Sequence, residues 1–384
     1  MTRPDAPVIM LSAGEASGDL HGGTLCRALR ELDPGLRLVG MGGPRMAAAG
    51  MELVADPTAG AVVGMSEAVG RIPGLYRAYR ALVRRLVAER PRALVLIDFP
   101  EFNLRLARRA RRAGVPVVYF IPPQLWAWRR GRIRQMARRV SRVLAVFPFE
   151  AALYAKARVP VDFVGHPLLD VLPLDLSREE ARRRLALDLG PSVVGLLPGS
   201  RREEVARLLP AMLQGAERLA AADGRRRFVL ALAPSVERAE VERLLAAAPG
   251  VRVEVVEGLT HEVMAGSDVV LIASGTATLE AALLGAPMVV CYRVSRLTEA
   301  VARMLARVPW ISLPNIAAGR RIVPEILQAQ VTGPRLAAEA LRLLEDAAAA
   351  TAQRAGFKDL RAGLGEPGVG RRAARAVLRA ARVA

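Results

Sequence analysis

The fold of this chain is decided by its opening stretch VIMLSAGEASGD, residues 8–19. An apolar run (8–12) leads into a loop of small and acidic residues, and an amphipathic segment (20–32) follows. A continuous apolar run is typical of a strand buried on both faces of a parallel sheet. The loop then lies at the carboxyl end of that strand, where ligands bind in this architecture.

Apolar runs and amphipathic segments alternate along the rest of the chain, with one irregular segment at 166–176 that we interpret as a linker. Further strands are predicted at 36–39, 93–97, 117–121, 143–146, 161–164, 193–197, 228–232, 251–256, 269–272 and 288–291. Helices are predicted at 20–32, 75–89, 102–113, 203–222, 235–248, 276–284, 335–346 and 371–382. The fold class is α/β: two doubly wound parallel-sheet domains in tandem, with a cleft between them.

The length and composition of the chain agree with a division into two domains. The 384 residues predict two domains, and a hydrophobic content of 52% excludes a disordered chain. Cys26 and Cys291 lie far apart in apolar stretches, which argues against a disulfide framework and favours a reducing compartment. We expect no signal peptide, and no apolar run reaches the ~20 residues that span a bilayer.

The formal net charge of +19 comes almost entirely from arginine. Arginine binds phosphate bidentately, so this charge suits nucleic acid, anionic lipid headgroups or a phosphorylated substrate. The arginines are spread over helices throughout the chain, and aromatic residues make up only 4% of it. Both features argue against a nucleic-acid-binding protein. Segment 71–85 mixes apolar and basic residues and could rest on an anionic membrane. An ordinary amphipathic helix, and a general preference for arginine, explain these features about as well.

Acidic residues follow two predicted strands of the first domain. Glu15 and Ser17 lie in the small-residue loop quoted above, and Asp98 directly follows the strand at 93–97. A carboxylate against an apolar strand is costly unless it is paired or used, and Asp98 could act as a general base. Helix capping by Ser17 or Asp19, and by Asp98, is the alternative for both loops.

The second domain carries two strand–turn–helix loops that suit an anion. In the first, Gly199, Ser200 and Arg201 form a small-residue turn that ends in a cation, but they are not a Walker loop. The small residues and the helix N-terminus favour phosphate.

The other loop consists of Ser274, Gly275 and Thr276, and Glu280 lies one turn into the helix that follows. The loop suits a diphosphate, and the carboxylate can accept two hydrogen bonds from a ribose diol. Alternatively, Thr276 caps the helix and Glu280 complements its dipole.

Residues 122–130, PPQLWAWRR, hold two of the three tryptophans. Aromatic faces stack on sugars and arginine binds phosphate, so Gln124, Trp128 and Arg129 are candidate substrate contacts. Core packing of one tryptophan is the alternative.

Several catalytic motifs are missing from the sequence. The three histidines are isolated, and there is no Asp-X-Asp, no GxSxG, no GxGxxG and no P-loop motif. We therefore expect no metal and no cofactor. Chemistry without a metal or a covalent nucleophile points to direct displacement assisted by a base.

Together, these motifs resemble those of the lipid-A-disaccharide synthases, in the same order and over almost the whole chain. The resemblance rests on residues 13–19, 42–46, 97–103, 126–129, 165–167, 197–201, 274–280 and 312–316. It implies a GT-B fold and an inverting glycosyltransferase of lipid A biosynthesis. The implied donor is UDP-2,3-diacylglucosamine and the acceptor 2,3-diacylglucosamine 1-phosphate; the products are a β(1→6) disaccharide 1-phosphate and UDP. It also implies a cytoplasmic protein, peripheral on the inner membrane.

The resemblance assigns roles as well. Asp98 is expected to be the base toward the acceptor 6-hydroxyl, with Glu15 as a second acidic group. Arg201 is expected at the UDP diphosphate, Glu280 at the ribose and Asn315 at the nucleotide. The resemblance implies that residues 1–167 form the acceptor-binding and catalytic domain and that residues 168–365 form the UDP-sugar-binding domain. A helix within 366–384 packs on the first domain or on a partner, so a homodimer is worth testing.

One departure from the family pattern is Pro122-Pro123, where many members have Ser-Pro. The rival enzymes are other GT-B proteins that use UDP-sugars, either a transferase with a water-soluble acceptor or a UDP-GlcNAc 2-epimerase. A nucleic-acid-binding protein is the rival outside enzymes, and it is suggested by charge alone.

Overall fold

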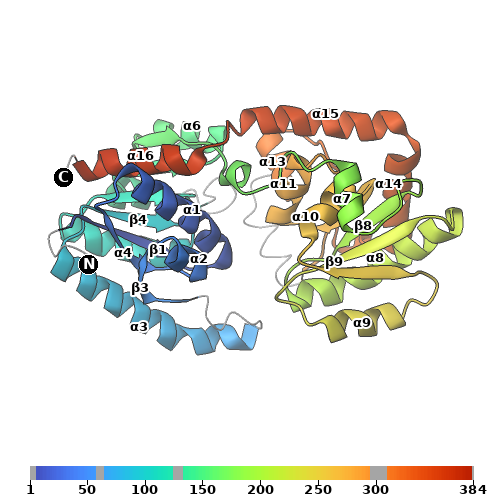
Figure 1. Ribbon diagram of the computed structural model, residues 1–384, viewed down its shortest axis with the longest axis horizontal. Helices are drawn as coiled ribbons and strands as arrows, with labels where there is room; N and C mark the ends of the chain where they lie inside the picture. The colour runs from blue at the N-terminus through green and yellow to red at the C-terminus, as the bar shows by residue number, and fades with distance from the viewer. Residues whose placement is uncertain (1–5, 58–64, 124–132, 295–308, 383–384) are drawn as a thin grey trace. The chain divides into compact units, whose positions relative to one another are not determined.

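The computed structural model describes residues 6–57, 65–123, 133–294 and 309–382, with residues 65–72 described by their backbone only. The chain forms two compact units, each built on one parallel sheet (Figure 1). Unit 1 comprises Met1–Asp170 and Leu364–Ala384, and unit 2 comprises Val171–Gly363. The chain therefore returns to unit 1 at its C-terminal end.

Unit 1 holds a seven-stranded sheet in the order β3-β2-β1-β4-β5-β6-β7, and every pair of strands is parallel. The central strands are continuous apolar runs and are buried, as expected for a sheet covered on both faces. The strands are β1 Val8–Ala13, β2 Arg37–Met41, β3 Glu52–Ala55, β4 Ala93–Ile97, β5 Val117–Phe120, β6 Arg142–Ala145 and β7 Val161–Phe163.

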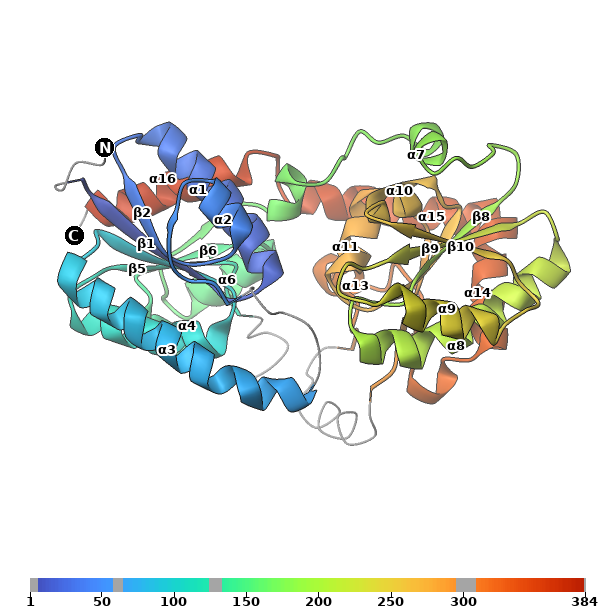
Figure 2. The ribbon, with the colours of Figure 1, turned by 60° about the horizontal axis from the view of Figure 1, so that its bottom comes forward.

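Helices cover both faces of this sheet (Figure 2). α3, α4 and α5 share one hydrophobic core with it, and α1 and α16 lie side by side on the opposite face. α16 can cover the sheet because most of its Ala and Val side chains are buried while most of its arginines face solvent. The helices are α1 Ala16–Leu32, α2 Pro44–Ala48, α3 Met65–Glu89, α4 Pro100–Arg112, α5 Ile133–Arg139, α6 Pro148–Lys156 and α16 Val369–Arg382.

Unit 2 repeats the design with six parallel strands in the order β10-β9-β8-β11-β12-β13. α8 and α14 pack together into its hydrophobic core. The strands are β8 Val193–Leu197, β9 Arg227–Leu232, β10 Val253–Glu257, β11 Val269–Ala273, β12 Met288–Tyr292 and β13 Glu325–Leu327. The helices are α7 Arg178–Arg184, α8 Arg202–Ala222, α9 Arg238–Ala246, α10 Thr260–Gly266, α11 Thr276–Leu283, α13 Leu313–Ala318, α14 Gly333–Glu345 and α15 Ala347–Gly363.

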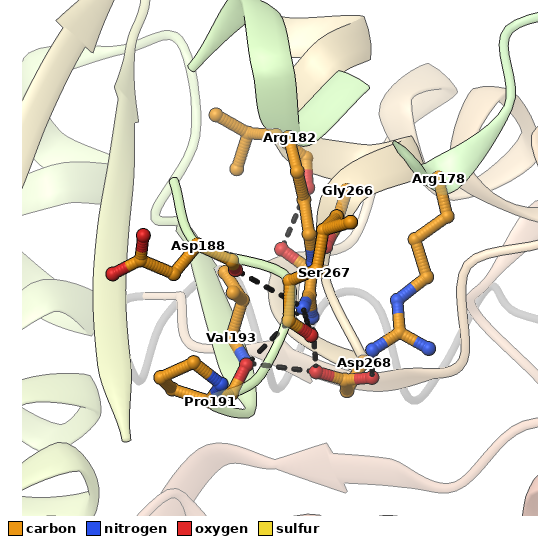
Figure 3. Close-up of polar contacts among 10 residues, drawn as sticks. Arg178, Arg182, Asp188, Pro191, Val193, Gly266, Ser267 and Asp268 are labelled. Atoms are coloured by element: carbon orange, nitrogen blue, oxygen red, sulfur yellow. Dashed lines mark hydrogen bonds and ion pairs between the residues drawn. The ribbon is translucent and has the colours of Figure 1, made fainter. Parts of the chain in front are cut away.

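A buried arginine ties α7 to the amino ends of two central strands of unit 2 (Figure 3). The Arg182 side chain is only 1% exposed, and it meets Asp268 at 2.6 Å and the Gly266 carbonyl at 2.9 Å. The same Asp268 carboxylate pairs with Arg178 and accepts the Val193 backbone N–H. Each charge is thus neutralised and hydrogen-bonded, which burial of a charged group requires.

Every predicted strand is present, with ends that differ by at most two residues. Two observed strands, β3 and β13, were not predicted. Both are short edge strands that begin with Glu, and only three and two apolar residues follow, so neither shows an apolar run long enough to be recognised. None of the described helices is both long and apolar enough to span a membrane.

Part of the expected linker is ordered within unit 1. Pro167–Asp170 forms a 3₁₀ helix, and the Asp170 carboxylate accepts the backbone N–H groups of Gly368, Val369 and Gly370. These donors lie at the start of α16, where N–H groups have no partner within the helix. Asp170 therefore fixes the point at which the chain rejoins unit 1.

Candidate active site

Each sheet has one place where the strand order reverses. In unit 1 it lies between β1 and β4, and in unit 2 between β8 and β11. Ligands of doubly wound sheets bind at this switch point, beyond the carboxyl ends of the strands. The loops after these four strands carry Glu15, Asp98, Arg201 and Ser274. Four of the predicted site loops therefore lie at the two switch points, two in each unit.

The backbone at Asp98 is strained and firmly held. Asp98 has φ +46° and Phe99 has φ +49°, and residues other than glycine rarely adopt this left-handed backbone conformation. Asn103, fully buried, donates to the Asp98 carbonyl at 2.7 Å, and the Tyr119 hydroxyl donates to the same oxygen at 2.7 Å. Strain that the surroundings hold in this way is typical of functional sites.

The capping interpretation of Asp98 is wrong. α4 begins at Pro100, and its N-cap position belongs to Phe99, which makes no side-chain capping bond. Phe99, with its left-handed backbone conformation, therefore lies between Asp98 and α4. The carboxyl group needs another explanation than helix capping.

The Asp98 carboxyl has an unusual pKa. Burial, followed by repulsion from Glu15, raises this pKa to about 6, against a smaller lowering by the Phe99 backbone N–H. Within the described part of the chain, no arginine, lysine or histidine pairs with it. A carboxyl group that ionises near neutral pH and has no cationic partner can accept a proton from a substrate hydroxyl.

Glu15 and Ser17 are both exposed beside this site. Glu15 occupies the N-cap position of α1, and neither Ser17 nor Asp19 caps that helix. Asp19 is buried instead and accepts the backbone N–H groups of Gly43, Arg45 and Met46 at 2.8–3.0 Å. The capping alternative for this loop is therefore wrong too, because Asp19 holds the start of α2.

A hollow of ≈ 740 Å³ in unit 1 is lined by Glu15, Phe99 and three arginines of α3. These arginines, Arg77, Arg80 and Arg84, belong to segment 71–85, for which the sequence left a membrane-facing role and an ordinary amphipathic helix as alternatives. Their spacing of three and four residues places them on one face of α3. That spacing was the signal by which the sequence could have assigned them to a site.

In unit 2, the loop between β8 and α8 directs two backbone N–H groups at one carboxylate. Ser200 and Arg201 donate to Glu204 at 3.2 and 3.3 Å, and the Arg201 side chain pairs with the same group. Gly199 has φ +118°, and a Cβ there would lie 2.5 Å from a Glu204 oxygen. The turn is thus shaped to hold an anion. Sequence analysis missed Glu204, although a Glu three residues after an N-cap is a known signal.

The loop between β11 and α11 brings further polar groups to the same switch point. Gly275 holds the N-cap position of α11, so Thr276 does not cap the helix. Ser274 donates to the Ile311 carbonyl at 3.0 Å. The Glu280 carboxylate lies 3.2 Å from the His261 ring, and this hydrogen bond raises the pKa of His261.

Asn315 lies in the interior of unit 2. Its amide nitrogen donates to the Val323 carbonyl and to Glu325, and its amide oxygen accepts the N–H groups of Ile322 and Val323. All its polar atoms are therefore used within the chain. Glu325, which sequence analysis missed, also accepts from Ser312, so the two side chains hold the segment before α13 in place.

Three of the predicted substrate contacts, Gln124, Trp128 and Arg129, lie outside the described residues. Among the described residues, no three or more His, Cys, Asp or Glu side chains gather in a way that could hold a metal ion.

The model of the protein family described as lipid-A-disaccharide synthetase matches residues 9–378. A curated lipid-A-disaccharide synthase from Anaeromyxobacter dehalogenans (strain 2CP-C) is 46% identical over 370 residues, 96% of each chain. Another from Geobacter sulfurreducens is 46% identical over 378 residues, 98% of each chain.

Solved structures with a similar fold include a UDP-GlcNAc 2-epimerase from Neisseria meningitidis bound to UDP-GlcNAc. Its TM-score is 0.61 at 15% identity, over 98% of this chain and 99% of that chain. The glycosyltransferase of kitacinnamycin gives a TM-score of 0.62 at 20% identity, over 98% and 100%. At these identities the likeness concerns the fold, which is GT-B. By the family match and the curated relatives, the chain belongs to the lipid-A-disaccharide synthase family, whose members are glycosyltransferases.

Proposed function

We propose that this family member transfers 2,3-diacylglucosamine from its UDP derivative to the 6-hydroxyl of 2,3-diacylglucosamine 1-phosphate. The products are the β(1→6) disaccharide 1-phosphate and UDP. The observation that carries the proposal is the combination of family membership with an Asp98 carboxyl of raised pKa at the switch point of unit 1, which pairs with no cation among the described residues. Such a group is what an inverting transfer without a covalent intermediate requires.

The proposed reaction is one displacement. The acceptor O6 attacks the anomeric carbon of the donor while its hydroxyl proton passes to the Asp98 carboxylate. The bond from that carbon to the diphosphate oxygen breaks, and its electron pair leaves with UDP. Burial, followed by the negative charge of Glu15, keeps the Asp98 pKa high enough for proton transfer near neutral pH, because both disfavour ionisation.

Donor binding is assigned to unit 2. The turn at Gly199–Arg201 and the loop at Ser274–Thr276 take the diphosphate, and Glu280 takes the ribose. The two N–H groups now directed at Glu204 support an anion in this turn, since they would bind a phosphate oxygen equally well. We assign Asn315 a positioning role, because its polar atoms are all bonded within the chain.

Acceptor binding is assigned to the hollow of unit 1 that Glu15 lines. Ser17, Gln124, Trp128 and Arg129 remain proposed substrate contacts from the resemblance. The arginines of α3 supply charge for the 1-phosphate of the acceptor, because guanidinium groups bind phosphate bidentately. We place the protein on the cytoplasmic face of the inner membrane, where acylated substrates partition.

The test is UDP release from UDP-2,3-diacylglucosamine in EDTA, with and without the monosaccharide 1-phosphate. We expect release that depends on the acceptor, survives chelation and disappears in Asp98→Asn. Release with UDP-GlcNAc alone, or epimerisation of that sugar, would favour the rival that shares only the fold. No release with any acceptor would overturn the proposal.

A further inference from the structure

Left-handed backbone gathers at the carboxyl ends of two neighbouring strands of unit 1. Asp98 and Phe99 follow β4, and Ile121, with φ +56°, follows β5. An aromatic or β-branched residue in this conformation costs free energy, which the surrounding structure has to offset. Elsewhere the conformation is found just after helices, where it is common, at Arg90, Arg158 and Ala186.

A turn from a strand to a helix at a switch point does not require this strain. In unit 2 the chain passes from β11 to α11 through Ser274 and Gly275, and neither residue is left-handed, since the Gly275 φ of 161° is extended backbone. Asp98 and Phe99 occupy the corresponding turn of unit 1, between β4 and α4. The strain at these two residues therefore needs a reason other than the topology of the sheet.

Two buried side chains, Asn103 and Tyr119, hold the strained turn by its Asp98 carbonyl oxygen. Both are 0% exposed, and each donates to this oxygen at 2.7 Å. The amide oxygen of Asn103 in turn accepts the Ser12 hydroxyl at 2.7 Å. We call Asn103 and Tyr119 the anchoring pair. Because they belong to α4 and β5, and Ser12 belongs to β1, three elements of unit 1 fix one carbonyl group.

The Phe99 ring connects the same turn to the loop that carries Glu15. A Cβ at Gly14 would overlap the Phe99 ring, so this ring lies directly against the glycine backbone. Glu15 is the next residue, and its charge is, after burial, the larger cause of the raised Asp98 pKa. The left-handed turn therefore holds the Asp98 loop against the Glu15 loop.

We propose that Asn103 and Tyr119 are positioning residues for the proton transfer. They act through Asp98: by holding its carbonyl they keep the turn left-handed, and the carboxyl stays buried beside the Glu15 loop. Without them the turn relaxes, and the carboxyl moves toward solvent. This inference rests on the proposed function and deepens it, because it names the residues that prepare the base for the acceptor hydroxyl.

The first test compares Tyr119→Phe with the matched control Tyr154→Phe in the full-length protein. Both tyrosines are buried in unit 1, and Tyr154 also donates its hydroxyl to a backbone carbonyl, that of Pro123 at 3.4 Å. Tyr119→Phe should lower kcat for acceptor-dependent UDP release roughly fivefold, as expected for one hydrogen bond, and leave the acceptor KM within about twofold. Tyr154→Phe should change neither quantity by more than about twofold.

Asn103→Ala removes the other donor and should lower kcat by about 10²-fold, the usual cost of displacing a catalytic group by ~1 Å. Circular dichroism and urea unfolding show whether this variant folds. If it does not, Tyr119→Phe decides the question, because it keeps the buried ring and removes one hydroxyl.

The second test measures the Asp98 pKa without turnover. Carbon-13 NMR of aspartate-labelled protein follows the carboxyl signals with pH, and the Asp98 signal is the one missing from Asp98→Asn. We expect a midpoint near pH 6 in the wild type and in Tyr154→Phe. In Tyr119→Phe the midpoint should move to lower pH, because a relaxed carboxyl loses burial and moves away from Glu15.

Three results would overturn the inference. They are equal kcat in Tyr119→Phe and Tyr154→Phe, an Asp98 midpoint that Tyr119→Phe leaves in place, and a rise in acceptor KM at unchanged kcat, which would make Tyr119 a substrate contact. Wild-type protein that releases no UDP with any acceptor would overturn the proposed function instead. The titration would then still show whether Tyr119 holds the Asp98 carboxyl.

Discussion

Asp98 and Asp268 border equivalent strands of the two units but lie at opposite ends. β4 and β11 each pair with the first strand of their sheet. Asp98 follows β4 at the carboxyl end, and Asp268 precedes β11 at the amino end. Asp268 is neutralised by Arg178 and Arg182, whereas the charged neighbour that shifts the Asp98 pKa, among the residues that the structure describes, is the negative Glu15.

This difference in charged neighbours distinguishes a carboxylate that stabilises the fold, Asp268, from one that can take part in proton transfer, Asp98. At the amino end of a strand, two arginines make the charge of Asp268 part of the framework (Figure 3). At the carboxyl end, burial without a cationic partner among the described residues leaves Asp98 able to exchange a proton near neutral pH. Removal of the charge should therefore have opposite consequences at the two positions.

The largest effect is expected on turnover. Asp98→Asn should lower acceptor-dependent UDP release by about 10²–10⁴-fold, because the amide cannot take the hydroxyl proton. Asp188→Asn makes the same chemical change at an exposed residue and should remain near the wild-type rate. Residual activity in Asp98→Asn within a few-fold of wild type would show that Asp98 is not the base.

The next effect is on the stability of unit 2. Asp268→Asn should cost roughly 3–5 kcal/mol of unfolding free energy, because it leaves the buried Arg182 guanidinium without a counter-ion. Urea unfolding measures this loss. Asp188 contributes only its backbone carbonyl to Arg182, so Asp188→Asn should change stability by no more than about 0.5 kcal/mol. Equal losses in both variants would show that the Asp268 carboxylate does not stabilise unit 2 by neutralising Arg182.

A smaller effect is expected on the pH profile. Because the ionised base is the active form, kcat/KM should fall tenfold per pH unit below about pH 6 and level off above it. Glu15→Gln removes a charge that raises the Asp98 pKa, so the midpoint should move to lower pH. A midpoint that stays in place would show that Glu15 does not act on Asp98.

The smallest effect is a gain in stability. The folded-state pKa of Asp98 is raised from 3.8 to about 6, so ionisation costs folding free energy above that pH. Asp98→Asn should therefore stabilise unit 1 above about pH 6, by at most ~3 kcal/mol, and give no gain below about pH 4. Asn also tolerates the left-handed backbone at this position. A loss of stability at pH 8 would contradict the assigned pKa shift.

Much of the fold could be read from the sequence, because buried parallel strands are continuous apolar runs. The runs at 93–97 and 269–272 identify β4 and β11 almost to the residue. The strands β3 and β13 could not be found in this way, since only three and two apolar residues follow the Glu with which each begins.

Only part of the candidate site could be predicted from the sequence. Asp98, Glu15 and the loops of unit 2 follow strands, and a position after a strand is a local property of the sequence. Asn103 and Tyr119, which hold the Asp98 backbone, are recognisable only from contacts between separate elements. Asn315 shows the same limit, because its four hydrogen bonds depend on the course of a loop that the motif does not encode.

The sequence by itself determined the α/β class, the two domains, the family resemblance and the loops at which to look for chemistry. Each of these depends on the local periodicity or order of residues. Only the tertiary structure decided which carboxylates are neutralised, that α16 belongs to unit 1, and that arginines of α4 and α5 line one hollow. The physical reason is that charge energies depend on distance and burial in space, and residues far apart in sequence set both.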